Sequence, residues 1–153
     1  MLTRCRTLLA AVLITTLAAC GGNSLAGSID VVFDLEFDEV AIVKQNQALR
    51  VEYRRTVDGL QEVPCKLVID IGPNDLGPGA TIDRTWFNDR VTIERVTYPG
   101  QRFPAVRYRG GELRIDSYDR NVGGTVSGAF DAFLNDGRTL YGTFIGAVED
   151  AEE

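Results

Sequence analysis

The stretch that decides the fold class covers residues 126–148 and reads VSGAFDAFLNDGRTLYGTFIGAV. Each of its halves places apolar residues at alternate positions, which is typical of a half-buried strand because successive side chains point to opposite faces of a sheet. A two-residue Asp136-Gly137 turn would mix the two faces. A three-residue loop closed by Gly137 with a positive φ keeps them apart and predicts an antiparallel hairpin in which phenylalanine rings cover glycines. The expected cross-strand pairs are Ala132–Leu140, Phe130–Gly142 and Gly128–Phe144.

The other face of this hairpin carries Phe133, Tyr141 and Ile145, so both of its faces are partly apolar. Two explanations are open. The hairpin is central in a layered fold and is covered on both sides, or it offers an apolar surface to a partner. We favour the covered position.

The rest of the chain repeats the alternating pattern about every ten residues, with turn-forming residues between the segments. No stretch of about ten residues keeps the 3.6-residue periodicity of a helix. The pattern therefore predicts an all-β fold, namely a single antiparallel β-sandwich or small barrel of about seven to nine strands. The expected strands are residues 29–38, 40–43, 49–54, 63–71, 91–98, 106–108 (ended by Gly110-Gly111) and 113–117, and the longest expected loop is residues 72–79.

The composition limits the possible functions. The 153 residues suit one domain, and 44% hydrophobic with 25% charged residues is ordinary for a globular protein. The net charge of −6 argues against a general nucleic-acid binder, which needs a basic surface. The sequence contains no histidine, which excludes Ser-His-Asp and Cys-His catalysis and every histidine metal site.

Residues 1–19 have the order of a secretory signal peptide. Arg4 and Arg6 come first, residues 8–17 are apolar apart from two threonines, and two alanines follow. A transmembrane helix is the alternative, but it needs about 20 apolar residues, and this run ends earlier, at Cys20. The pattern favours a signal peptide.

The end of this segment, Leu17-Ala18-Ala19-Cys20-Gly21, resembles the lipobox of bacterial lipoproteins. In that family a lipid is attached to the cysteine sulfur, the signal peptide is cut just before the cysteine, and the freed amine is acylated. The resemblance implies that Cys20 carries fatty acyl chains such as palmitate. Gly21 is not the aspartate that retains such proteins at the inner membrane, which favours the outer membrane. Ordinary secretion with a chance cysteine is the alternative.

The C-terminal stretch shows a second resemblance. Residues 124–130 and 136–144 are similar to the closing hairpin of many small, uncharacterised bacterial lipoproteins. This resemblance implies a β-rich domain. It implies no activity and no functional residue, because none is established for that group.

These features divide the chain into four parts. Residues 1–19 are the signal peptide, residues 20–28 a flexible tether, residues 29–148 the β-domain, and residues 149–153 an acidic tail. Removal of the signal peptide takes away two arginines and changes the net charge from −6 to −8. We expect anionic headgroups to repel such a domain, so that the lipid, and not the protein surface, is the anchor.

The three cysteines offer little further chemistry. Cys5 leaves with the signal peptide, Cys20 becomes a thioether, and Cys65 remains alone, so no disulfide can form within the mature chain. Cys65 shares a strand face with Leu67 and Ile69, which predicts a buried, inert thiol.

The acidic residues have simpler explanations than catalysis or metal binding. Alternate acids in residues 30–38 are best interpreted as the solvated side of a strand rather than as the carboxylate pair of a hydrolase. The oxygen-rich turns lack the spacing of an EF-hand, and Asp and Asn are common in turns for backbone reasons. The acids of the strand are Asp30, Asp34, Glu36 and Asp38, and the calcium candidates are Asp116, Asp119 and Asn121, then Asn74-Asp75 and Asn135-Asp136.

Trp86-Phe87 is the remaining candidate site, because it lies among charged residues. An exposed tryptophan there would be a stacking surface for a sugar or a peptide. The alternative, which we favour, is a core plug on an irregular connection.

We therefore expect a lipid-anchored protein of the bacterial cell envelope that needs no cofactor and catalyses no reaction. It binds the membrane through the lipid on Cys20 and serves as a binding or structural module, with an envelope protein or a glycan as partner. The alternatives are a carbohydrate-binding module centred on Trp86 and a carboxylate- or metal-dependent hydrolase. The sequence assigns no catalytic, cofactor or metal residue.

Overall fold

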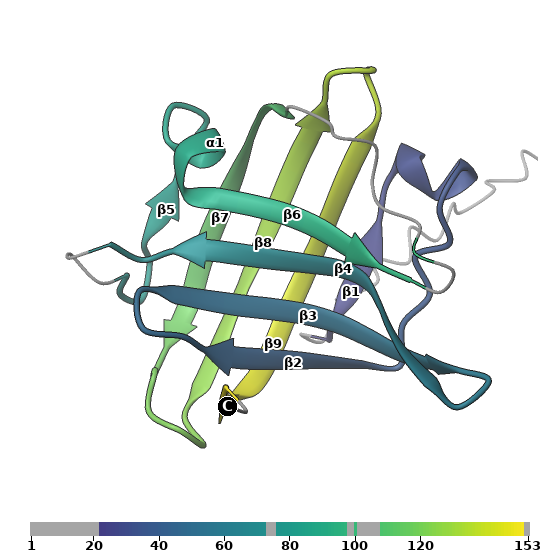
Figure 1. The fold of residues 1–153 in the computed structure, drawn as a ribbon. Helices are drawn as coiled ribbons and strands as arrows, with labels where there is room; N and C mark the ends of the chain where they lie inside the picture. Colours follow the sequence, from purple (N-terminus) through teal and green to yellow (C-terminus); the bar gives the residue numbers. More distant parts are fainter. Residues whose placement is uncertain (1–21, 73–75, 98–99, 101–107, 152–153) are drawn as a thin grey trace, which may run out of the picture.

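The computed structural model describes residues 22–72, 76–97, 100 and 108–151, and it consists mostly of strands (Figure 1). The all-β prediction and its number of strands are confirmed. The described helices are one turn each, η1 (Ser28–Val31) and α1 (Phe87–Arg90). The strands are β1 (Ser24–Ala26), β2 (Glu39–Lys44), β3 (Ala48–Val57), β4 (Leu60–Asp70), β5 (Thr81–Ile82), β6 (Val91–Val96), β7 (Tyr108–Tyr118), β8 (Thr125–Leu134) and β9 (Thr139–Asp150).

The strands form one strongly curled sheet, a half-barrel, in the order β5-β7-β8-β9-β2-β3-β4-β6. Among the described strands every pairing is antiparallel except the parallel one between β2 and β9, so the sheet is mixed and not purely antiparallel as expected. In Figure 1 the β2–β3–β4–β6 arm crosses in front of the β7–β8–β9 arm. The long strand β9 joins the arms, because its first half pairs with β1 and its last residues pair with β2.

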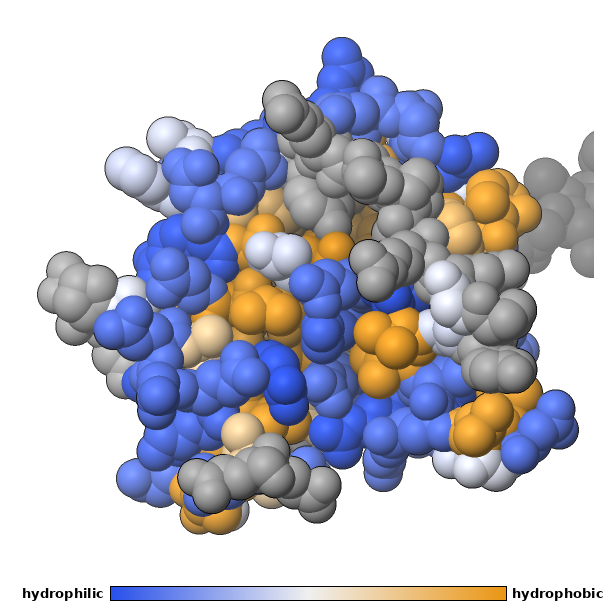
Figure 2. All heavy atoms as spheres, viewed as in Figure 1, coloured by the Kyte–Doolittle hydropathy of each residue, from blue (hydrophilic) through white to orange (hydrophobic). Residues whose placement is uncertain are grey.

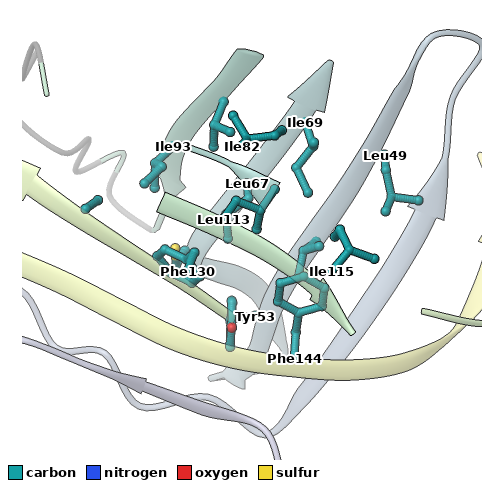
Figure 3. Close-up of a cluster of buried hydrophobic side chains, with 14 of the residues drawn as sticks. Leu49, Tyr53, Leu67, Ile69, Ile82, Ile93, Leu113, Ile115, Phe130 and Phe144 are labelled. Atoms are coloured by element: carbon teal, nitrogen blue, oxygen red, sulfur yellow. The ribbon is translucent and has the colours of Figure 1, made fainter. Parts of the chain in front are cut away.

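The core fills the space between the two arms (Figure 3). Alternate residues of each strand point inward, as the period of two requires. Tyr53 lies near the centre with no exposed surface; its ring contacts that of Phe37 edge-on at 5.0 Å, and its hydroxyl donates to the Thr143 carbonyl at 3.0 Å. The buried set includes Ile42, Leu49, Val51, Leu67, Ile69, Ile82, Leu113, Ile115, Val126, Phe130, Leu140 and Phe144.

The predicted C-terminal hairpin is confirmed in register and in turn. Gly137 has a φ of 87°, and the Leu134 amide donates to the Arg138 carbonyl at 2.8 Å. A Cβ on Gly142 would lie 2.8 Å from the Phe130 ring, so the ring covers the glycine closely. The observed pairs are Ala132–Leu140, Phe130–Gly142 and Gly128–Phe144, as expected.

The strand expected over residues 29–38 is wrong. Residues 28–31 form η1, which leaves Val31 85% exposed, and the loop that follows buries Leu35. The edge of β9 that such a strand would need is shared by β1 and β2. Alternation alone does not tell whether a partner edge is free, which explains the error.

Three boundaries also differ from the expectations. Gly110-Gly111 does not end a strand, because β7 runs through both glycines and continues to Tyr118. Residues 22–28 are not a free tether, since β1 pairs with β9. Glu149 and Asp150 belong to β9 rather than to a frayed tail. The strands expected over residues 40–43, 49–54, 63–71, 91–98 and 113–117 are present as β2, β3, β4, β6 and part of β7, whereas residues 98, 106 and 107 lie outside the described residues.

Candidate functional site

The first described residues of the chain lie along the edge of β9. Ser24 pairs with Thr143, and the Thr143 hydroxyl donates to the Gly22 carbonyl at 2.7 Å. The Asn23 side-chain oxygen accepts a hydrogen bond from the Ile145 amide at 2.6 Å. The chain is therefore fixed on the sheet from Gly22 onward.

Two glycines and Ser28 explain why this segment docks here. A Cβ on Gly142 would lie 2.6 Å from the Ser24 carbonyl oxygen, so the glycine permits the close approach of β1. Gly27 has a φ of 147° and passes the Thr139 carbonyl, where a side chain would collide. The Ser28 hydroxyl then accepts from the Thr139 amide at 2.9 Å. These contacts hold both ends of β1.

The predicted lipidation residue, Cys20, lies outside the described residues. Only Gly21 separates it from Gly22, and two extended residues span at most about 7 Å. The backbone of the proposed lipidation residue therefore lies within about 7 Å of Gly22, which is bonded to Thr143 of β9.

The second apolar face of the C-terminal hairpin is open. Tyr141 is 50% exposed and Ile145 is 43% exposed, and both flank Thr143 on the outside of β9. Phe133 on β8 is half-buried, with the Arg84 guanidinium 5.0 Å above its ring. The expectation that this face is covered is wrong for Tyr141 and Ile145, because the sheet curls away from them and encloses only its inner side.

Two acids of residues 30–38 have side-chain partners: Asp34 binds Arg55 and the Glu36 amide, and Asp38 accepts from the Thr56 amide. Arg55 forms an ion pair with Asp34 and donates to Glu62 at 2.8 Å, and Arg95 donates to the Asp34 carbonyl at 2.8 Å. The Glu36 amide, followed by the Arg55 guanidinium, lowers the pKa of the Asp34 carboxyl. A general acid needs a raised pKa, so this cluster offers no support for the hydrolase. It fixes the loop that replaces the expected strand.

The calcium candidates use their oxygens locally. Asp116 binds Arg114 at 2.7 Å, Asp119 accepts from the Asn121 side chain at 2.8 Å, and Asp136 binds Arg138. Among the residues that the structure describes, no group of three or more acids or cysteines is placed to hold a metal ion. Asn74-Asp75 lies outside the described residues.

The buried thiol predicted for Cys65 is confirmed. Its side chain has no exposed surface, and burial raises the pKa of the thiol far above its usual value. A thiol that stays protonated is a poor nucleophile.

Trp86 and Phe87 separate in the structure. Phe87 has no exposed surface and packs in the core, as the plug explanation requires. Trp86 is 58% exposed, so for this residue the plug prediction is wrong. The one-turn helix α1 accounts for the difference, because it turns successive side chains in different directions.

A polar groove of about 950 Å³ lies where the β2–β3 turn, α1 and the end of β9 meet. Lys44, Asp70 and Arg90 line it, and the Arg90 guanidinium donates to the Asp70 carbonyl at 2.8 and 3.0 Å. Its residues are far apart in the chain and carry no common motif, so this groove could not be predicted from the sequence.

Comparison with known proteins adds no family to these observations, since no family model, no curated protein and no solved structure matches the chain. Within the described ranges, no helix has the length and hydrophobicity needed to cross a membrane.

Proposed function

We propose that the protein is a lipoprotein of the bacterial cell envelope whose β-domain serves as a non-catalytic binding or structural module at the outer membrane. The observation that supports this most is the lipobox-like sequence of residues 17–21 at the end of a signal-peptide pattern. Gly22, the first of the described residues, already bonds to Thr143 of β9, so the proposed lipid would be attached close to the folded domain.

The lipid supplies the membrane affinity. Each buried methylene contributes about 0.8 kcal/mol, and one acyl chain alone gives only marginal, reversible binding. The two or three chains implied by the lipobox make release slow. A mature net charge of −8, after loss of the two signal-peptide arginines from a chain of −6, adds no attraction to anionic headgroups.

The absence of catalysis is supported by the chemistry of the side chains. The sequence has no histidine, and Cys65, the one cysteine of the mature chain besides Cys20, is buried. The Asp34 carboxylate, an acid weighed above for a hydrolase, forms an ion pair with Arg55. These residues favour a module that binds or spaces other envelope components.

Incorporation of a labelled palmitate analogue in a bacterial host tests the proposal. We expect label on the wild-type protein and none on Cys20→Ala, because the thioether and the freed amine both belong to residue 20. Cys5→Ala is the matched control: it removes a cysteine from the signal peptide and leaves the label in place. Equal labelling of Cys20→Ala and the wild type would overturn the proposal.

A glycan-binding module is the second candidate, and the 58% exposure of Trp86 is the observation that favours it. Because Trp86 is the single tryptophan in the chain, its fluorescence reports on this one position. A glycan that binds here changes the emission of the wild type and does not bind Trp86→Ala. A glycan array whose hits leave the emission unchanged would remove this candidate.

A further inference from the structure

We propose that the outer side of β9 beside β1, made of Tyr141, Thr143 and Ile145, is the face that the protein turns toward the bilayer, where it contacts zwitterionic phospholipid headgroups. We call these three residues the anchor-side face. The inference rests on the proposed lipidation of Cys20 and adds an orientation to it.

The reach of the chain carries the argument. Gly22 is bound to the Thr143 hydroxyl at 2.7 Å, and Asn23 is bound to the Ile145 amide at 2.6 Å. Cys20 lies two residues before Gly22, within about 7 Å at full extension. Acyl chains on Cys20 that enter a bilayer therefore keep the middle of the anchor-side face close to the headgroups.

The side chains of this face suit an interface between water and lipid. Tyr141 is half-exposed, and tyrosine rings are enriched at headgroup level because one end is apolar and the other polar. Ile145 exposes 43% of its surface. The Thr143 hydroxyl already bonds to Gly22 and Ser24, so contact with lipid leaves it satisfied.

The surrounding charge selects the headgroup and limits the depth. Asp131 lies opposite Tyr141 on the neighbouring strand β8, and Glu112 lies opposite Asp131 on β7. Cross-strand partners share a face of the sheet. Arg114, in the same cross-strand row as Thr143, forms an ion pair with Asp116, so Glu112 and Asp131 keep the charge of this face negative. This charge favours neutral over anionic headgroups and keeps the contact shallow, so the face orients the domain while the acyl chains hold it.

Fluorescent labelling of the mature lipidated protein in phosphatidylethanolamine–phosphatidylcholine vesicles tests the orientation. An environment-sensitive thiol probe is placed at Ile145→Cys, while the buried Cys65 does not react in the folded protein. The matched control is Val122→Cys, because Val122 is 60% exposed and lies outside the anchor-side face. Its neighbour Gly123 donates its amide to the Val148 carbonyl, near the C-terminal end of β9.

We expect the emission of the Ile145→Cys probe to shift to shorter wavelength on reconstitution, with several-fold weaker quenching by aqueous iodide. The Val122→Cys probe should keep its emission and its quenching. Phosphatidylglycerol in place of the neutral lipids should reduce the shift at residue 145.

Two outcomes would overturn the inference. Either the two probes stay equally accessible to iodide in vesicles that carry the protein, or the residue-145 probe is protected only in native envelope and not in pure lipid, which would indicate a protein partner. A third outcome concerns the lipid anchor itself. If the protein does not co-float with the vesicles because it carries no acyl chains, the proposed lipidation of Cys20 is refuted, which is distinct from the two failures of orientation.

Discussion

The two arms of the sheet differ on their outer faces. On the β2–β3–β4–β6 arm, Glu52 binds Arg50 at 3.3 Å and Arg54 at 2.7 Å, and Arg54 continues to Glu149 on β9. In Figure 2 hydrophilic residues cover most of this side and surround hydrophobic patches, and Val96 of β6 is 52% exposed. The outer side of the β7–β8–β9 arm instead exposes Tyr141 and Ile145 beside the start of the folded chain.

This difference suggests that the two outer faces of the sheet meet different surroundings, although they enclose one core. A ladder of ion pairs gives the outer face of one arm a polar surface, while a half-apolar face is suited to a boundary between water and lipid. The strand that joins the arms, β9, combines both kinds of surface. Its first half exposes apolar side chains beside β1, and its end contributes Glu149 to the ion pairs. Four changes test how far this contrast holds.

The largest effect is expected for Phe144→Ala, on the inner side of β9. Phe144 is 2% exposed and covers Gly128, so its loss should lower the free energy of unfolding by about 3–5 kcal/mol, measured by urea denaturation of the purified protein. Ile145→Ala, the next residue on the outer side, should change it by about 0.5 kcal/mol or less. Equal losses at both positions would show that the outer side is not open.

Glu52→Gln should have the next largest effect, because this residue is 8% exposed between two arginines. Loss of its charge should lower the free energy of unfolding by about 2 kcal/mol in the same assay. Glu94→Gln is the control: it removes the partner of Lys66 at a more exposed position and should cost about 1 kcal/mol at most. An unchanged free energy of unfolding in Glu52→Gln would mean that the ion pairs of Glu52 contribute nothing to stability.

Thr143→Val should loosen β1 without unfolding the domain. It removes the hydroxyl that binds Gly22 and Ser24, and we expect hydrogen exchange at residues 24–26 to show an opening free energy lower by about 1 kcal/mol. Thr125→Val on the neighbouring strand should leave that protection unchanged. Unaltered exchange in Thr143→Val would contradict the proposed role of this residue in holding the N-terminal segment.

The smallest effect concerns pH. The Glu36 amide and Arg55 lower the pKa of Asp34 in the folded protein, so the folded state binds fewer protons than the unfolded state at this group. Its stabilisation is present above the unfolded value and is lost as the pH falls below about 4 and through the folded value. The urea midpoint of Asp34→Asn should therefore fall less between pH 7 and pH 3 than that of the wild type.

The size of that pH effect is limited by solvent, since half of the Asp34 side chain is exposed. Asp58→Asn in the exposed β3–β4 turn is the control and should follow the wild-type pH dependence. An identical dependence in Asp34→Asn would remove Asp34 from the account of stability.

Local patterns predicted the parts of the fold that depend on neighbouring residues. The C-terminal hairpin is correct in register because Gly137 fixes the turn and the turn fixes the pairs. Residues 29–38 alternate just as regularly, yet Ser28–Val31 forms η1. Whether a strand forms there depends on a free edge of β9, which is a property of the whole sheet and is absent from the local sequence.

The same limit applies to the candidate site. The sequence singled out Tyr141 and Ile145, but it did not show that curling of the sheet leaves them open. It also missed the docking of Gly22 onto Thr143, since 121 positions separate these residues and each bond is set by strand order. Cys20 remains a prediction from the lipobox-like residues alone.

Mass spectrometry of the N-terminal peptide of the protein isolated from its own envelope shows whether Cys20 is the lipidated first residue of the mature chain. We expect a chain that begins at Cys20 and carries acyl chains on its sulfur and its amine. A chain that begins at any other residue, or that has an unmodified Cys20, would contradict this expectation.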